Sequence, residues 1–195
     1  MIMPRVNYVD FRNDNFNFRY IYFPQKVSAG RPLPKRTFFD CYELEHLRLP
    51  TNINNDDNIQ FYRSSNGFFN NNFTRLRFVR YPSTPILRGR VFDNLPSLER
   101  IDLTPNLQII QRKAITECPK LKTVNLPEGL KQIDGRAFHD CPNLTDVTLP
   151  STIERMYNDS FDATTTVSIS EEKKGVIPSD HQYTVKIISS PSEAF

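Results

Sequence analysis

The sequence predicts a mainly β fold, a β-rich solenoid of stacked coils. First, the stretch from Val91 to Phe161 divides into successive lines of 23 residues whose apolar positions fall in the same columns. A fixed period of 20 to 50 residues with apolar columns is typical of solenoids. Second, a proline recurs shortly after the apolar segment of each line, and prolines prevent long helices. Third, helical periodicity is weak throughout. We therefore expect about six coils with short strands, few short helical or 3₁₀ turns, and a cap at each end.

The regular lines begin at Val91, Ala114 and Ala137. Each coil of a solenoid packs only on its neighbours, so each apolar column predicts a ladder of buried side chains that runs along the stack. The columns are Phe92, Ile115, Phe138 and Phe161; Leu98, Leu121 and Leu144; Ile101, Val124 and Val147; Leu103, Leu126 and Leu149; Leu107, Leu130 and Ile153; and Ile110, Ile133 and Met156.

Further copies of the same pattern precede the regular lines; the copy at 38–50 is a good one and the others are degenerate. The segments FRYIYFP (18–24), FFDCYELEHLRLP (38–50) and LRFVRYP (76–82) each hold a strand template that ends in proline. After Phe161 the pattern decays into two alternating runs, 164–170 and 182–189, which are typical of strands. We predict an N-terminal cap with a degenerate first coil over residues 1–36, a solenoid over 37–161 with regular repeats over 91–161, and a C-terminal β cap with a loose tail over 162–195.

The repeat also carries a family resemblance. Residues 137–156 follow the pattern AFxxCxxLxxVxLPxxLxxI at nearly every defining position. Residues 114–133 depart at Ile115, and residues 91–110 depart at Val91, at Leu95 and by the extra Thr104. The pattern resembles the BspA-like class of leucine-rich repeat. This resemblance implies a curved, right-handed solenoid that is used for protein interaction, usually without catalysis or a cofactor.

Charge and hydropathy limit the classes of partner. The chain holds 25 basic and 22 acidic residues, a net charge of +3, which is too small to indicate a nucleic-acid binder by charge alone. The N-terminus lacks the apolar core of a secretory signal, and no run approaches the roughly 18 apolar residues of a membrane span. We therefore expect an intracellular protein, cytoplasmic or in a virion, with no membrane partner.

The cysteines Cys41, Cys118 and Cys141 occupy the same position of the repeat template. We interpret them as a structural core ladder, because cysteine fills small buried positions well. Cys118 and Cys141 stand one coil apart, so a disulfide between them stays open. No CxxC pair is present, and we expect no metal site. Cys141 should point inward and His139 outward, which argues against a cysteine–histidine enzyme, and we predict no catalytic residue.

The outward side of the predicted strands offers the best candidate site. Alternation within a strand sends the residues on either side of a buried position outward, and stacking aligns them across coils. Aromatic residues and arginine are enriched at protein interfaces, so the first coils predict a binding face for a protein partner with an acidic patch. The predicted face consists of Tyr20, Tyr22, His46, Arg48, Phe78, Arg80, Arg100 and Asp102, and is followed by Thr123, Asn125, Asp146 and Thr148. The alternative interpretation is that these side chains form a solvated surface that serves only solubility.

Two further functions stay open. Asparagine clusters and long polar loops fit a structural or minor component of a larger assembly, such as a virus particle. The additional arginines at positions 75, 77, 88 and 90 suggest a nucleic-acid binder with a basic patch, because basic stripes with aromatic residues bind single-stranded nucleic acid. Glu45, Glu99 and Asp102 interrupt that stripe, which makes this function less favoured.

Overall fold

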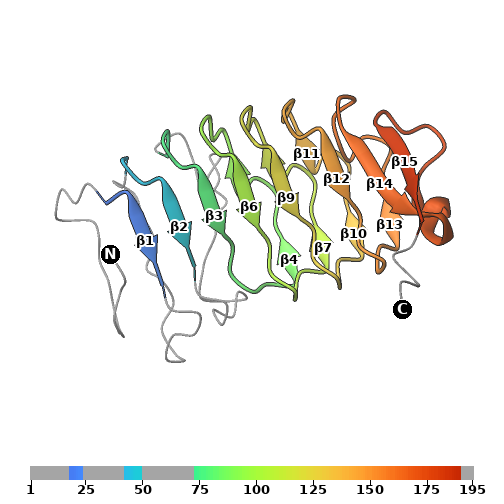
Figure 1. Cartoon of the computed structure of the whole chain (residues 1–195), viewed down its shortest axis with the longest axis horizontal. Helices are drawn as coiled ribbons and strands as arrows, with labels where there is room; N and C mark the ends of the chain where they lie inside the picture. The colour runs from blue at the N-terminus through green and yellow to red at the C-terminus, as the bar shows by residue number, and fades with distance from the viewer. Residues whose placement is uncertain (1–17, 24–41, 50–72, 190–195) are drawn as a thin grey trace.

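The computed structural model describes residues 18–23, 42–49 and 73–189. In Figure 1 the coils stack side by side along one axis, from β1 at the N-terminal end to β15 at the C-terminal end. The strands are two to five residues long, and every strand pair among the described residues is parallel, as a stack of coils requires. This architecture confirms the predicted β-rich solenoid.

The described strands form four parallel sheets. A regular coil contributes one strand to each of three of them, as when β6, β7 and β8 follow one another along the chain. The first sheet holds β1 (Tyr20–Tyr22), β2 (His46–Arg48), β3 (Phe78–Arg80), β6 (Arg100–Asp102) and β9 (Thr123–Asn125). The second holds β4 (Ile86–Leu87), β7 (Ile109–Ile110), β10 (Gln132–Ile133) and β13 (Arg155–Met156), and the third holds β5 (Phe92–Asp93), β8 (Ile115–Thr116) and β11 (Phe138–His139).

The fourth sheet closes the C-terminal end. It consists of β12 (Asp146–Thr148), β14 (Thr166–Ser170) and β15 (Thr184–Ile188), in that order. The two alternating runs predicted after Phe161 are therefore strands β14 and β15, and the 3₁₀ helix η1 (Glu171–Val176) lies between them. Figure 1 shows β12 beside β9, so this sheet continues the row of the first one.

The corners of the coils repeat as regularly as the strands. Non-glycine residues with positive φ recur on both sides of the third sheet, at Arg90, Lys113 and Arg136 before its strands and at Asn94, Glu117 and Asp140 after them. A non-glycine residue in the left-handed conformation costs about 1–2 kcal/mol, so neighbouring coils must hold the corner in place. They do so through backbone bonds between coils, such as Lys113 N–H to the Arg136 carbonyl at 3.0 Å.

The apolar columns of the sequence form one continuous core. Ile101, Leu121 and Ile133 are fully buried, and the other columns are buried with the exception of Leu126, which is partly buried against the core. In the aromatic column, Phe138 stacks on Phe161 with ring centroids 4.7 Å apart. The core thus runs from coil to coil and has no single centre, as expected for a solenoid.

Some predictions fall outside the described residues. These are Cys41, most of the N-terminal cap and the tail at 190–195. The boundaries of the three predicted regions stay a prediction.

The aromatic column gives a direct test of this core. Phe138→Ala should lower the free energy of unfolding by about 3–5 kcal/mol, because it removes a buried ring and leaves a cavity against Phe161. Glu172→Ala, at an exposed position of η1, should change it by less than about 0.5 kcal/mol. Urea denaturation followed by circular dichroism measures both, and equal stability of the two variants would show that the column is not packed.

Candidate functional site: the face of the first sheet

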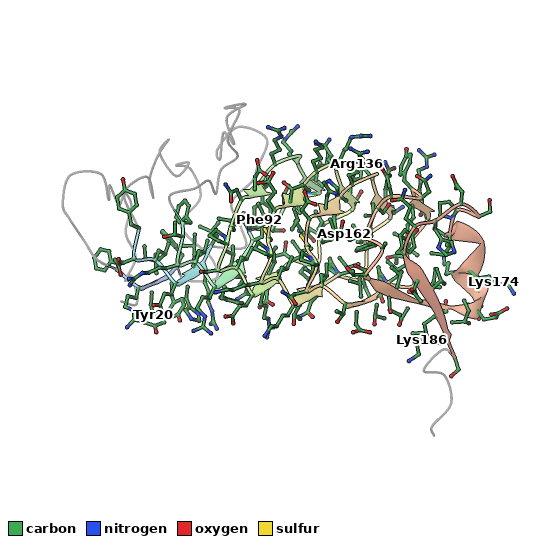
Figure 2. All side chains as sticks on the ribbon, turned by 90° about the horizontal axis from the view of Figure 1, so that it is seen from above. Tyr20, Phe92, Arg136, Asp162, Lys174 and Lys186 are labelled. Carbon is green, nitrogen blue, oxygen red and sulfur yellow. The ribbon has the colours of Figure 1, made fainter. Side chains whose placement is uncertain are left out.

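The side chains predicted to form a binding face lie in two rows across the first sheet. Strand pairing aligns one row through Tyr20, His46, Phe78, Arg100 and Thr123, and a second row through Tyr22, Arg48, Arg80, Asp102 and Asn125. We call these ten residues the strand face. The middle residue of each strand is buried, which turns the residues on either side of it outward. Figure 2 shows Tyr20 on the opposite side of the stack from Arg136.

Aromatic rings line the N-terminal half of the first row. The ring of His46 lies 5.0 Å from that of Tyr20 and 5.9 Å from that of Phe78, measured between centroids. Tyr20 is 40% exposed, while His46 and Phe78 are half-buried. Three rings on three successive strands of the sheet therefore form a continuous, partly exposed aromatic strip.

Arginines cover the edges of this strip. The guanidinium carbon of Arg48 lies 5.0 Å from the ring centroid of Tyr22 and 5.7 Å from that of Phe78. That of Arg100 lies 5.8 Å from the Phe78 ring. Cation–π contacts of this kind are worth about 0.5–1 kcal/mol at exposed sites. They hold the Arg48 head group in place without neutralising it.

The acidic residues around the face are paired with arginines. Glu45 accepts a hydrogen bond from Arg19 Nε at 2.9 Å, and Glu99 accepts two from Arg77 at 3.1 Å. These hydrogen bonds are the main cause that lowers the pKa of each carboxyl below its usual range. Asp102 accepts a bond of 2.7 Å from Arg100 on the same strand. The acidic residues that interrupt the basic stripe in the sequence are thus neutralised locally.

Arg48 and Arg80 differ from the other arginines of the face. They are Cα partners on the neighbouring strands β2 and β3. Among the described residues, neither forms an ion pair with a carboxylate, whereas Arg100 pairs with Asp102. Within the part of the chain that the structure describes, the face therefore presents two adjacent cations that no carboxylate pairs, beside an aromatic strip.

The C-terminal half of the face has a different character. Thr123 and Asn125 are exposed on β9, and next to the strand face Asp146 and Thr148 are exposed on β12. These side chains are small, polar or acidic. The aromatic and basic character therefore belongs to β1, β2, β3 and β6, as the sequence predicted.

The cysteines of the described residues belong to the core. Cys118 and Cys141 are both buried and free. The Cys118 thiol donates to the Thr116 carbonyl at 3.3 Å, and the Cys141 thiol to the His139 carbonyl at 3.6 Å. A hydrogen bond with Cys141, together with burial, raises the pKa of the Cys118 thiol. A raised pKa disfavours the thiolate that a nucleophile or metal ligand requires.

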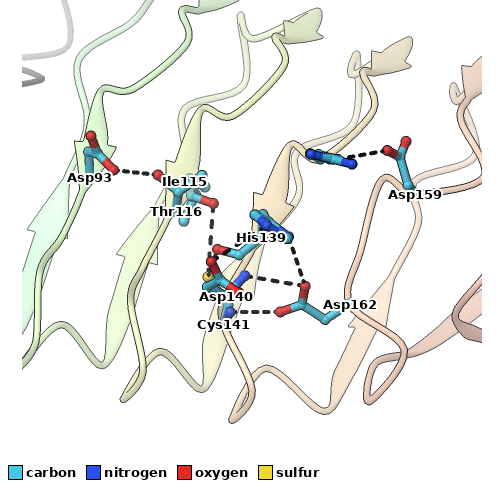
Figure 3. A network of polar contacts seen from close by, with 9 residues as sticks. Asp93, Ile115, Thr116, His139, Asp140, Cys141, Asp159 and Asp162 are labelled. Carbon is cyan, nitrogen blue, oxygen red and sulfur yellow. Dashed lines mark hydrogen bonds and ion pairs between the residues drawn. The ribbon is translucent and has the colours of Figure 1, made fainter. Parts of the chain in front are cut away.

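A polar network lies at the corners after the third sheet (Figure 3). The Asp162 carboxylate accepts hydrogen bonds from the backbone N–H groups of Asp140, at 3.2 Å, and Cys141, at 2.7 Å. His139 Nδ1 lies 3.5 Å from Asp162. Residues 93, 116, 139 and 162 share one column, and Thr116 donates to Asp93 at 2.6 Å in the same way. The His139 imidazole thus lies beside carboxylates, whereas the Cys141 thiol donates to backbone carbonyls.

Beside this network lies an open depression of about 540 Å³. Sequence analysis did not predict it, because its residues come from four successive coils, and only their shared positions in the repeat could have indicated it. It is lined by Asn94, Glu117, Pro119, Asp140, Pro142, Asp162 and Thr164.

Within residues 18–23, 42–49 and 73–189, no group of three or more histidine, cysteine, aspartate or glutamate side chains is placed to hold a metal ion. In the same residues, none of the helices has the length and apolar character that a membrane span demands.

Comparison with known proteins places the chain in a family. The family model described as BspA type leucine rich repeat region, with six copies, matches residues 7–77 and 64–175. The chain therefore belongs to the BspA-type leucine-rich repeat family, which confirms the resemblance seen in the sequence. Such repeats generally serve as protein-interaction modules.

One solved structure is also similar. It is a leucine rich cell surface protein from Faecalibacterium prausnitzii, at 16% sequence identity and a TM-score of 0.49. The match covers 92% of this chain and 50% of that one, so the chain spans about half the length of that protein. The comparison with curated proteins found no match.

The position of His46 gives a prediction about pH. Burial is the main cause that lowers the pKa of His46 below its ordinary value of 6.5, and Arg77 and Arg48 lower it further, while Glu45 and Glu99 raise it. As the pH falls below 6.5, the unfolded chain binds a proton at His46 before the folded chain does. The free energy of unfolding should therefore fall over this range and level off below the folded pKa.

His46→Gln should flatten that part of the stability profile. Urea denaturation at a series of pH values measures the slope, and an NMR titration of the imidazole gives the folded pKa directly. An unchanged slope in His46→Gln, or a folded pKa at or above 6.5, would contradict the burial of this ring within the aromatic strip.

Proposed function

We propose that this protein is a non-catalytic module that binds another protein through the strand face. The observation that carries the proposal is the cluster formed by Tyr22, Arg48, Phe78 and Arg80. It combines two half-buried aromatic rings with two cations that form no ion pair with a carboxylate of the described residues. Tyrosine and arginine are the residues that most often dominate binding energy at protein interfaces.

The sheet beneath the face lowers the cost of binding. In the first sheet β2, β3 and β6 are each hydrogen-bonded on both sides, so the backbone under Arg48, Phe78 and Arg80 is already ordered. The Arg48 head group is also held over two rings. Binding therefore costs less conformational free energy at this site than it would on a flexible loop, which would have to become ordered. The affinity comes mainly from the aromatic strip, and the arginines select an acidic partner.

Charge argues against a nucleic-acid partner. Arg19, Arg77 and Arg100 are paired with carboxylates, and the rows continue into Thr123, Asn125 and Asp146. A strand-binding groove needs a basic track along several phosphates. Two unmatched cations at one end of the face fit a local acidic patch on a protein better.

Affinity purification from the source cells tests this function. The double substitution Arg48→Glu/Arg80→Glu should reduce retention of a discrete protein partner at least about tenfold, because both reversed charges lie at the centre of the cluster. The matched control Arg88→Glu/Arg112→Glu changes the net charge equally. Its residues are exposed just after β4 and β7, outside the strand face, and it should retain the partner.

Two outcomes would contradict the proposal. Equal loss of the partner in both double variants would indicate a general charge effect. Recovery of a whole set of coat or scaffold proteins, in the strand-face variant as well as in the wild type, would indicate a structural subunit that does not use this face as its main contact.

A further inference from the structure

We propose that Arg48 and Arg80 together bind one phosphate group, and that the partner segment recognised by the strand face is a phosphorylated peptide. This inference rests on the proposed function and specifies the chemistry of its partner. It starts from the two cations of the face, Arg48 and Arg80, that no carboxylate of the described residues pairs.

The two arginines are placed to act on a single group. Arg48 and Arg80 are Cα partners on adjacent parallel strands, which places their backbones about 4.8 Å apart. Both side chains point away from the core, because the residue that precedes each of them on its strand, Leu47 or Val79, is fully buried. Their guanidinium groups carry like charges at partner positions of the sheet. An anion that bridges them relieves the repulsion between them.

The charge and the number of acceptors favour phosphate over carboxylate. A phosphorylated side chain carries a charge of about −1.5 to −2 at neutral pH and three strong acceptor oxygens. It can therefore neutralise both guanidinium groups at once and accept a forked hydrogen bond from each. A single carboxylate carries one charge and two oxygens, so it leaves one of the two cations unmatched.

The rings organise Arg48 for this role. With Tyr22 at 5.0 Å and Phe78 at 5.7 Å from its guanidinium carbon, Arg48 rests against aromatic surface. Such contacts engage the guanidinium without using its strong N–H donors on a carboxylate. Arg80 is half-buried, which limits the number of conformations that its long side chain loses on binding.

The neighbouring charges confine the site to one phosphate. In the second row the residue after Arg80 is Asp102, whose carboxylate is bonded to Arg100, so this ion pair offers no unpaired cation to a second phosphate. In the first row Phe78 separates His46 from Arg100. A nucleic-acid backbone, with phosphates in series, would meet Asp102 at its next step. The surroundings thus favour an isolated phosphate with aromatic or apolar residues beside it.

Titration with defined peptides tests the inference on the intact chain. The probes are a five-residue peptide with one central phosphoserine among glycines and alanines, the same peptide with serine, and the same peptide with two adjacent glutamates. Isothermal calorimetry gives affinities, and NMR of the arginine Nε–H groups shows which residues respond. The phosphopeptide should bind about tenfold more tightly than the diglutamate peptide, with the largest shifts at Arg48 and Arg80.

Variants separate the pair from general charge. Arg48→Gln and Arg80→Gln should each weaken phosphopeptide binding about tenfold, and Arg80→Lys should recover only part of it, because lysine keeps the charge and loses the fork. Arg88→Gln serves as the control and should bind as the wild type does. A short oligothymidylate should compete no better than inorganic phosphate at equal phosphate concentration.

The results distinguish this inference from the function on which it rests. Equal affinity for the diglutamate and phosphoserine peptides, or shifts spread over all arginines, would overturn the phosphate site. If phosphatase treatment of the captured partner leaves capture intact while Arg48→Glu/Arg80→Glu abolishes it, the strand face stands and the phosphate inference falls. If the double variant has no effect on capture, the proposed function itself fails.

Discussion

Parallel pairing of equivalent strands, one coil apart, is the constraint on which the rest of this structure depends. In the regular repeats the spacing of 23 residues brings each strand beside its counterpart with no shift in register, as in Arg100 against Thr123. Each coil on its own would expose its apolar side, and only stacking buries it. The left-handed corners and the aromatic stack of Phe138 on Phe161 both require the neighbouring coil. Register therefore fixes the core and the surface together.

The same register creates the chemistry of the strand face. Because side chains of equivalent positions are brought into rows, a residue far away in sequence becomes an immediate neighbour. Arg48 and Arg80 are 32 positions apart in the chain and are partners in the sheet. Rows of this kind place similar side chains next to one another. The fold tolerates neighbouring arginines where a carboxylate or an aromatic ring lies beside them. Arg77 has Glu99 and Arg48 has two rings, whereas Arg80 has no acidic neighbour in ion-pair range in the described residues.

Much of this arrangement was predictable from the sequence. The columns that end in Leu144 and Met156 predicted the buried ladders, and strand alternation predicted the two rows of the face. The ion pairs of Glu45 and Glu99 were not predictable, because their partners Arg19 and Arg77 come from neighbouring coils whose spacing is irregular. The depression at the corners was missed for a related reason, since turn conformation and not residue type shapes it. The binding role of the face stays a proposal.

A cross-linking experiment tests the central claim, that the strand face is a set of rows in register. Arg48→Cys/Arg80→Cys places two thiols at partner positions of adjacent strands, within the Cα separation of about 4.4–6.8 Å that a disulfide needs. The account predicts that mild oxidation joins them, as identified by mass spectrometry of the digested chain. Arg48→Cys/Asp102→Cys, two strands apart in the same row, should not be joined. Efficient joining of the second pair, or none of the first, would contradict the register and with it the proposed face.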